Sequence, residues 1–173
     1  MHKRESNSFS PVIRMSAIGL IHTPFKQAEG TPIQGAAAKG GRGVVELFPQ
    51  FMPGLQDVSG FERLWLIYML DRASAAQLLV RPYLDKEVRG VFATRSPARP
   101  NPIGLSAVRL LGIEENRLLI ADVDMLDNTP LLDIKPYVPE FDSFSLARAG
   151  WYTGKTAAGA VADDRFEAPS LPE

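Results

Sequence analysis

Residues 105–126, LSAVRLLGIEENRLLIADVDML, hold two runs of branched apolar residues on either side of a short polar stretch. Runs of this kind, bounded by turn residues, are typical of β-strands. They predict a hairpin with strands over residues 105–113 and 117–126. The turn between them is Glu114-Glu115-Asn116, and Asn116 is expected to take the left-handed conformation. This hairpin is the clearest element of the predicted fold.

Further short strands are predicted on both sides of the hairpin, over residues 15–22, 44–48, 61–70, 88–94 and 131–134. One or two helical turns are predicted over residues 73–80. The chain has 14 glycines and 14 prolines, which are spread along its length, and residues 54–81 and 103–129 are two of its long stretches without proline. Since helices tolerate neither residue well in their interior, we do not expect a helical bundle. We therefore predict a mainly all-β fold, a small closed or nearly closed β-barrel with short helices and long functional loops.

Composition places the chain among ordinary soluble globular proteins. It has 173 residues, 45% of them apolar and 23% charged, with a net charge of −1. The absence of cysteine excludes disulfides and thiolate metal sites. The longest apolar run, residues 64–70, is too short to span a bilayer, and no secretory signal is evident, so we expect a cytoplasmic protein without membrane contact.

The domain organisation expected from composition is simple. Residues 1–14 are polar and are predicted to form an irregular lead-in. Residues 15–153 form the barrel domain. Residues 154–173 are predicted to be a mobile tail, because large apolar residues are scarce there.

A proline-rich loop over residues 94–104, TRSPARPNPIG, is the first candidate site. Its three prolines restrict the backbone in advance, so the loop loses little entropy on binding. Arg95, Arg99 and Asn101 supply hydrogen-bond donors suited to carboxylates, phosphates or base edges. A rigid surface turn with solvated arginines is the alternative. The surrounding segment, residues 81–99, is locally basic and suits a phosphate backbone, although the near-neutral chain excludes strong indiscriminate nucleic-acid binding.

An aspartate-bearing segment over residues 122–136 is the second candidate site. In a strand, Asp122 and Asp124 would point to one face and Val123 and Met125 to the other. Carboxylates aimed into a pocket accept hydrogen bonds from hydroxyls or amines, or face a sulfonium or metal ion. A solvated acidic strand end followed by the turn at Asp127-Asn128 is the alternative. The spacing does not match a calcium loop, and no metal site is predicted.

The chain resembles the TsaA-like (YaeB-like) family of TrmO-type tRNA methyltransferases. The resemblance covers roughly residues 16–140. It is carried by residues 18–26, Pro32 and Gln34, 45–47, 54–55, 61–66, 90–97, 99–106, Asp124, Asp127, and 129–137, and the string ATRSP-RPNPIG is its most specific part. Three positions depart from the family pattern: Ile33 stands where Arg is usual, Asp71 where many members have His, and Asn128 where Gly is common.

The resemblance implies a β-barrel enzyme that uses S-adenosyl-L-methionine to methylate N6 of threonylcarbamoyl-adenosine beside the tRNA anticodon. It also implies a homodimer with the methyl donor near the subunit contact. The implied donor-binding residues are Gln34, Gly35, Ala36, Ala37, Asp71, Arg72, Arg95, Leu105, Asp124, Met125, Leu126 and Asp127.

Methyl transfer from a sulfonium chiefly requires alignment of acceptor, carbon and sulfur. The acceptor nitrogen also loses a proton, for which Asp127 and Asp71 are candidates. Arg99, Asn101, Lys135 and Tyr137 are predicted to contact the RNA. Two alternatives remain: a barrel that binds S-adenosylmethionine or RNA without chemistry, and a methyltransferase that acts on a small metabolite.

Overall fold

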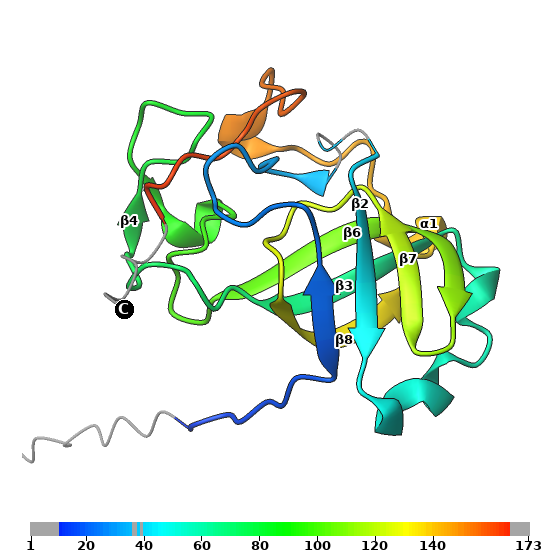
Figure 1. The fold of residues 1–173 in the computed structure, drawn as a ribbon. Helices are drawn as coiled ribbons and strands as arrows, with labels where there is room; N and C mark the ends of the chain where they lie inside the picture. The colour runs from blue at the N-terminus through cyan, green and yellow to red at the C-terminus, as the bar shows by residue number, and fades with distance from the viewer. Residues whose placement is uncertain (1–10, 36–37, 39, 167–173) are drawn as a thin grey trace, which may run out of the picture.

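The computed structural model describes residues 11–35, 38 and 40–166, and its centre is a closed antiparallel barrel (Figure 1). Around the barrel the strands follow the order β1-β2-β7-β6-β3-β8. Their bounds are β1 Gly19–His22, β2 Arg42–Leu47, β3 Arg63–Met69, β6 Ile103–Glu114, β7 Arg117–Ala121 and β8 Thr129–Pro136. The prediction of a mainly all-β barrel is confirmed.

Alternating side chains build the barrel core. Along β3, Leu64, Leu66 and Tyr68 point inward and are buried, whereas the residues between them are partly exposed. The same period of two runs through β6 and β7, and the inward residues of all six strands form one apolar cluster. Pairing of β8 with both β1 and β3 closes the barrel, with a register shift in the β3–β8 ladder between Ile67 and Tyr68.

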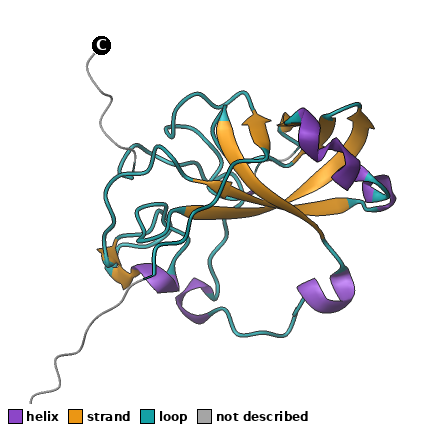
Figure 2. Ribbon diagram, turned by 90° about the horizontal axis from the view of Figure 1, so that it is seen from below, coloured by secondary structure: helices purple, strands orange, loops and turns teal. Residues whose placement is uncertain are grey.

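The remaining elements are small and peripheral. Beside the barrel, β4 Leu79–Val80 pairs with β5 Arg89–Gly90. Figure 2 shows the short helices at the edges of the strands: α1 Pro139–Asp142 and 3₁₀ helices at Pro49–Leu55, Val58–Gly60, Val91–Ala93 and Gly150–Tyr152. In the described part of the chain, no helix has the length and apolar character needed to cross a membrane.

Two element predictions beside the barrel are wrong. Residues 73–78 form an irregular loop with bends, and the short strand β4 follows it, instead of a helix. The strand predicted over residues 88–94 ends at Gly90, and a 3₁₀ helix follows at Val91–Ala93. The reason lies in packing: Val80 and Val91 are both buried in a second apolar cluster outside the barrel, and the chain bends to place them there.

The β6–β7 hairpin has the predicted strands, but its turn and its second strand differ in detail. Glu115, with φ of 54°, takes the left-handed conformation, and Asn116 instead donates from Nδ2 to the carbonyl oxygen of Leu47 at 2.8 Å. Strand β7 ends at Ala121 because Asp122 is left-handed, with φ of 65°. Asn128, with φ of 60°, does occupy a left-handed turn position as its residue type indicates.

The described part of the predicted tail, residues 154–166, contacts the rest of the chain instead of hanging free. Val161 bridges Pro32, and the backbone N–H of Ala162 donates to the carbonyl of Thr31 at 2.7 Å. Phe166 is buried beside Val80. In Figure 1 this orange-to-red segment crosses above the barrel next to the blue loop that follows β1. We call residues 154–166 the C-terminal strap.

Candidate functional site

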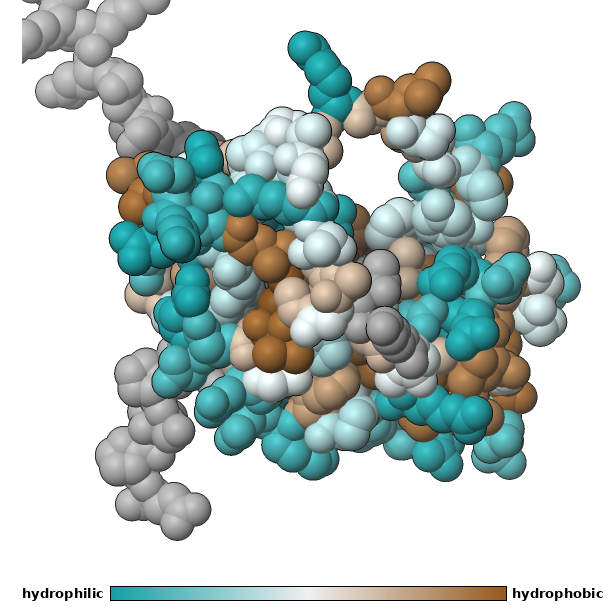
Figure 3. Space-filling model, turned by 90° about the horizontal axis from the view of Figure 1, so that it is seen from above, coloured by the Kyte–Doolittle hydropathy of each residue, from teal (hydrophilic) through white to brown (hydrophobic). Residues whose placement is uncertain are grey.

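A cavity of about 490 Å³ lies at one end of the barrel, where β3 ends and β6 begins. Its wall combines the two segments singled out in the sequence, the proline-rich loop and the aspartate-bearing segment. Figure 3 shows the face above the barrel, with apolar side chains gathered toward the middle and hydrophilic ones around them. The volume lies within the range typical of small-molecule sites.

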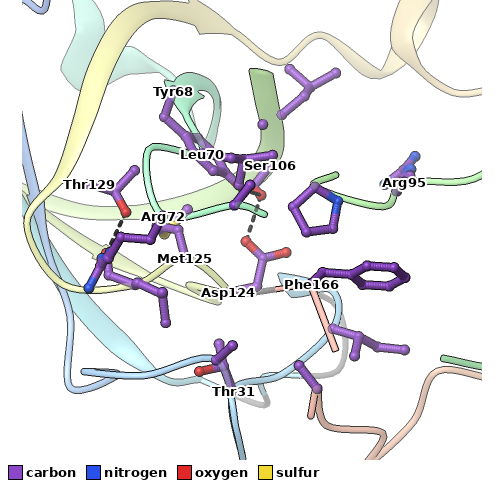
Figure 4. Close-up of a pocket in the computed structure, with 18 of the residues that line it drawn as sticks. Thr31, Tyr68, Leu70, Arg72, Arg95, Ser106, Asp124, Met125, Thr129 and Phe166 are labelled. Atoms are coloured by element: carbon purple, nitrogen blue, oxygen red, sulfur yellow. Dashed lines mark hydrogen bonds between the residues drawn. The ribbon is translucent and has the colours of Figure 1, made fainter. Parts of the chain in front are cut away.

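Asp124 is the central polar group of this cavity (Figure 4). The hydroxyl of Ser106 donates to its carboxylate at 2.6 Å, and the backbone of Gly35 donates to it as well. Tyr68 in turn hydrogen-bonds Ser106 at 2.9 Å. Burial raises the pKa of Asp124 above its ordinary value, while these donors and the nearby Arg95 act in the opposite direction. The carboxylate is therefore costly to keep charged without a cationic ligand.

Two arginines stand on opposite sides of Asp124 in Figure 4. Arg95 comes from the proline-rich loop, is exposed, and donates to the side-chain oxygen of Gln34. Arg72 follows β3 and donates to the carbonyl oxygens of Asp127 at 2.6 Å and Lys26 at 3.3 Å. Arg72 therefore ties two loops to the end of β3, whereas Arg95 keeps donors available at the cavity mouth.

Apolar groups line much of the remaining wall. Leu70, Ile103 and Leu105 come from the ends of β3 and β6, and Leu126 follows Asp124. Leu105 is 50% exposed although it lines the cavity. From the C-terminal strap, Phe166 completes the wall.

Most of the predicted site residues line this cavity. They are Gln34, Asp71, Arg72, Arg95, Arg99, Asn101, Leu105, Asp124, Met125 and Leu126. Gly35 adjoins it through its hydrogen bond to Asp124. Ala36 and Ala37 lie outside the described residues.

Asp122 does not share the cavity with Asp124, as a continuous strand would require. It lies in an ion pair with Arg63 at 3.0 Å and accepts the backbone N–H of Gly40 at 3.2 Å. The left-handed backbone at Asp122 breaks the alternation of side chains along the strand, so the carboxylates of Asp122 and Asp124 lie in different parts of the structure.

Asp127 is also absent from the cavity wall. Its carboxylate accepts the backbone N–H of Thr23 at 3.0 Å and pairs with Lys26. The ammonium of Lys26 and this backbone donor lower the pKa of Asp127. The side chain is therefore engaged in holding the loop after β1.

Lys135 and Tyr137 lie near the opposite end of β3. Lys135 pairs with Asp133 at 2.8 Å, and the ring of Tyr137 lies 5.4 Å from that of Trp65. The backbone N–H of Tyr137 donates to the carbonyl oxygen of Arg63, the first residue of β3. The cavity lies at the other end of this strand, where Tyr68 lines it.

Sequence reasoning missed several wall residues, namely Thr31, Tyr68, Ser106, Thr129 and Phe166. For Ser106 a signal was present. It occupies an inward-facing position of β6 between the buried Gly104 and Val108, and a hydroxyl at such a position needs a polar partner. Phe166 had no local signal, because its role depends on a contact with residues distant in the sequence.

Among the described residues, no group of three or more His, Cys, Asp or Glu side chains is arranged to hold a metal ion. The polar chemistry of the cavity is instead one buried carboxylate facing basic side chains, within largely apolar walls.

Comparison with known proteins identifies relatives of this chain. A "probable S-adenosyl-L-methionine-binding protein" of Pyrococcus abyssi is 58% identical over 134 residues, which make up 78% of this chain and 73% of that protein. The "tRNA (adenine(37)-N6)-methyltransferase" of Mus musculus is 32% identical over 133 residues, 73% of this chain but 31% of the mouse protein. A crystal structure of TrmO from Pseudomonas aeruginosa matches with a TM-score of 0.70 and 37% identity, covering 83% of this chain and 63% of that one.

The model of the family described as the tRNA-methyltransferase O N-terminal domain matches residues 20–143, which include all six barrel strands except the first residue of β1. The resemblance seen in the sequence is thereby confirmed, and the chain belongs to this family.

Proposed function

We propose that the cavity around Asp124 binds S-adenosyl-L-methionine and that the chain is a methyltransferase. The observation that carries this proposal is the buried carboxylate of Asp124 in one cavity with Arg95 and apolar side chains. The donor is a zwitterion with a sulfonium, so its site needs an anionic group, a cationic group and an apolar surface. Its positive groups fit Asp124, its carboxylate fits Arg95, and its adenine fits the walls at Ile103, Leu105 and Leu126.

When bound, S-adenosyl-L-methionine supplies a methyl group already activated by the sulfonium, so this chain chiefly binds and orients. The closed barrel holds Asp124 through Ser106 and Tyr68, which form a hydrogen-bonded chain from the core to the cavity. Burial raises the pKa of Tyr68, which keeps its phenol neutral and able to donate. Such a fixed arrangement lowers the entropic cost of aligning the reactants.

The acceptor we propose is N6 of adenosine 37 of tRNA, as in the name of the mouse relative, carrying a threonylcarbamoyl group. Arg99 and Asn101 line the cavity and are placed to contact the RNA beside the reacting base. Lys135 and Tyr137 are at the other end of the barrel, so we assign them only to contacts with tRNA remote from that base.

Of the two candidate proton acceptors, we propose Asp71. It lines the cavity, and its side chain is 42% exposed, with Arg72 Nε 3.9 Å from its carboxylate. Asp127 is less suited, because Lys26 and Thr23 already occupy its oxygens and favour its charged, weakly basic form.

We further propose a cytoplasmic homodimer with the donor cavity near the subunit contact. Leu105 supports this proposal, because it lines the cavity yet leaves half of its surface exposed, as expected where a second subunit completes the wall. Sedimentation analysis of the purified protein tests the dimer directly.

The enzymatic proposal is tested by mass spectrometry of nucleosides from tRNA incubated with the protein and S-adenosyl-L-methionine. Two tRNA samples are compared, one with threonylcarbamoyl-adenosine and one transcribed without modification. A methyl gain confined to the modified nucleoside is expected. Methylation of both samples would contradict the threonylcarbamoyl requirement, and methylation of neither would remove the tRNA assignment.

The donor site is tested by calorimetry of S-adenosyl-L-methionine binding to Arg95→Ala. Loss of a charge-assisted contact weakens binding by about 1.5–3 kcal/mol. Arg81→Ala is the matched control, because Arg81 is also an exposed arginine but does not line the cavity. Equal affinities of the two variants would remove Arg95 from the site.

A second candidate function is donor binding without chemistry. It is favoured by the 58% identity to an archaeal protein named only for binding S-adenosyl-L-methionine. The two experiments separate the candidates, since a binding protein would show donor affinity in calorimetry and add no methyl group to any tRNA.

A further inference from the structure

A second cavity, of about 630 Å³, opens on the other side of Arg95 and Gln34 from the donor cavity. The two cavities are neighbours because six residues line both of them: Ile33, Gln34, Tyr83, Thr94, Arg95 and Phe166. The hydrogen bond from Arg95 to Gln34 is therefore a partition between them. A ligand seated in the second cavity is within reach of a donor seated in the first.

Five aromatic side chains line the second cavity, which we call the aromatic pocket: Tyr83, Phe92, Trp151, Tyr152 and Phe166. Phe92 is 78% exposed, so its ring is available to a flat ligand. The indole N–H of Trp151 donates to the carbonyl of Ala93 at 2.7 Å, which fixes Trp151 beside Phe92. Tyr152 packs edge-on against Trp151, with ring centroids 6.0 Å apart. Arrays of exposed rings are the usual means of holding unpaired nucleobases.

Basic side chains surround these rings. The guanidinium of Arg89 lies 5.8 Å from the Trp151 ring and the ammonium of Lys155 lies 5.6 Å from it. Both pair with Asp85, whose pKa is lowered to about 2 by its hydrogen bonds to Arg89, Glu87 and Lys155, despite its desolvation. One carboxylate faces two cations, and Arg95 adds a third at the partition, so these groups together carry a net positive charge beside the rings, which suits a phosphate backbone.

Part of the pocket wall comes from residues outside the family domain. The family model ends at residue 143, whereas Trp151, Tyr152, Ala157 and Phe166 all come later. The strap that carries the last two is attached to the barrel loops by the bridge of Val161 to Pro32. Residues after the family domain therefore complete a pocket whose other wall the family domain supplies.

We propose that the aromatic pocket binds an unpaired nucleobase of the RNA substrate, stacked on Phe92, with the adjoining phosphates beside Arg89 and Lys155. The proposal rests on the proposed function, because it places the RNA next to the donor cavity. It assigns to the pocket-lining residues between 149 and 166 a role in substrate binding, and it makes Phe92 a binding residue for the RNA and not for the methyl donor.

The test uses the full chain and a threonylcarbamoylated anticodon stem–loop RNA labelled for fluorescence anisotropy. Phe92→Leu keeps an apolar side chain but removes the ring, and Phe92→Tyr keeps the ring. We expect Phe92→Leu to weaken RNA binding roughly tenfold, the loss of one stacking partner. We expect Phe92→Tyr to bind RNA like the wild type, and both to bind S-adenosyl-L-methionine within twofold of the wild type.

Phe144→Leu is the matched control, because Phe144 is 75% exposed and lines neither cavity. Equal RNA affinity of Phe92→Leu and Phe144→Leu, in a preparation whose wild type methylates tRNA, would overturn the aromatic pocket as a base site and leave the proposed function standing. A wild type that neither binds nor methylates the RNA would refute the proposed function and this inference together.

Discussion

Ser106 on β6 donates a 2.6 Å hydrogen bond to Asp124, and thereby connects the barrel core to the cavity around Asp124. A serine hydroxyl has one proton, so the 2.9 Å contact between Ser106 and Tyr68 has the phenol as its donor. The direction of the chain, from Tyr68 through Ser106 to Asp124, stabilises a carboxylate that burial would otherwise favour in its protonated form.

Replacement of Asp124 tests whether that carboxylate binds the donor. Asp124→Asn removes the charge but keeps the shape, and we expect the affinity for S-adenosyl-L-methionine to fall by about 1.5–3 kcal/mol in calorimetry. Asp133→Asn is the control, because Asp133 lies on β8, outside the cavity wall, and its affinity should match the wild type. Unchanged binding by Asp124→Asn would contradict the assignment.

The stabilities of the wild type and of Asp124→Asn are expected to depend differently on pH. Because burial raises the pKa of Asp124, the folded state holds its proton more tightly than the unfolded state does. The contribution of Asp124 to the free energy of unfolding is therefore fully present below its ordinary pKa and is lost as the pH rises through the raised value. We expect Asp124→Asn to gain stability relative to the wild type as the pH rises from about 3 to about 7. Urea unfolding of both proteins across this pH range checks the prediction. A constant difference between their free energies of unfolding would disprove it.

Gly104→Ala is predicted to damage the barrel end where the cavity begins. A Cβ at residue 104 would lie 2.1 Å from Cε2 of the Tyr68 ring, which is itself buried. Overpacking of this kind costs about 1–3 kcal/mol. In urea unfolding, Gly60→Ala is the control, because nothing lies within 4 Å of its added Cβ. Equal midpoints for the two variants would show that Tyr68 can move aside.

Asp127→Asn should reduce stability more than activity. The change weakens the bonds to the Thr23 backbone and to Lys26, and the expected loss is about 1 kcal/mol of unfolding free energy. Since Asp127 does not line the cavity, the rate of tRNA methylation should stay within a few-fold of the wild type. Loss of methylation in a fully folded variant would reinstate Asp127 as the proton acceptor.

Phe166→Ala should release the C-terminal strap. Phe166 is only 5% exposed and packs with Val80, Val91 and Ala98, so its truncation costs about 3–5 kcal/mol where the surroundings cannot relax. We expect faster proteolysis within residues 154–166 and weaker donor binding, because Phe166 lines the cavity. Leu146→Ala, at a residue 98% exposed, is the control and should change neither measurement.

The barrel was predictable because its strands alternate inward and outward residues, and that pattern is local. The run from Arg63 to Met69 and the β6–β7 hairpin carry it clearly. Residues 73–80 carry no such local pattern, because their structure depends on Val80, which packs against Val91 and Phe166, residues distant in the sequence. A helix prediction from composition cannot include such a contact.

The candidate site was predictable to the extent that motif residues line one cavity. Arg95 and Asp124 both do. Asp122 and Asp127 do not, because the left-handed backbone at Asp122 and the attraction of Lys26 for Asp127 redirect two neighbouring carboxylates. The contribution of Phe166 could not be read from its surroundings in the sequence, which are polar and poor in large apolar residues.

The bridge between Pro32 and Val161 has a consequence for the order of folding. Its two sides are separated by nearly the whole barrel, so a nascent chain that has emerged from the ribosome only as far as β8 already contains every barrel strand but not yet the residues that finish the cavity wall. During synthesis, the barrel can assemble before the cavity wall is complete, because Ala162 and Phe166 join that wall only after residues 154–166 have been translated.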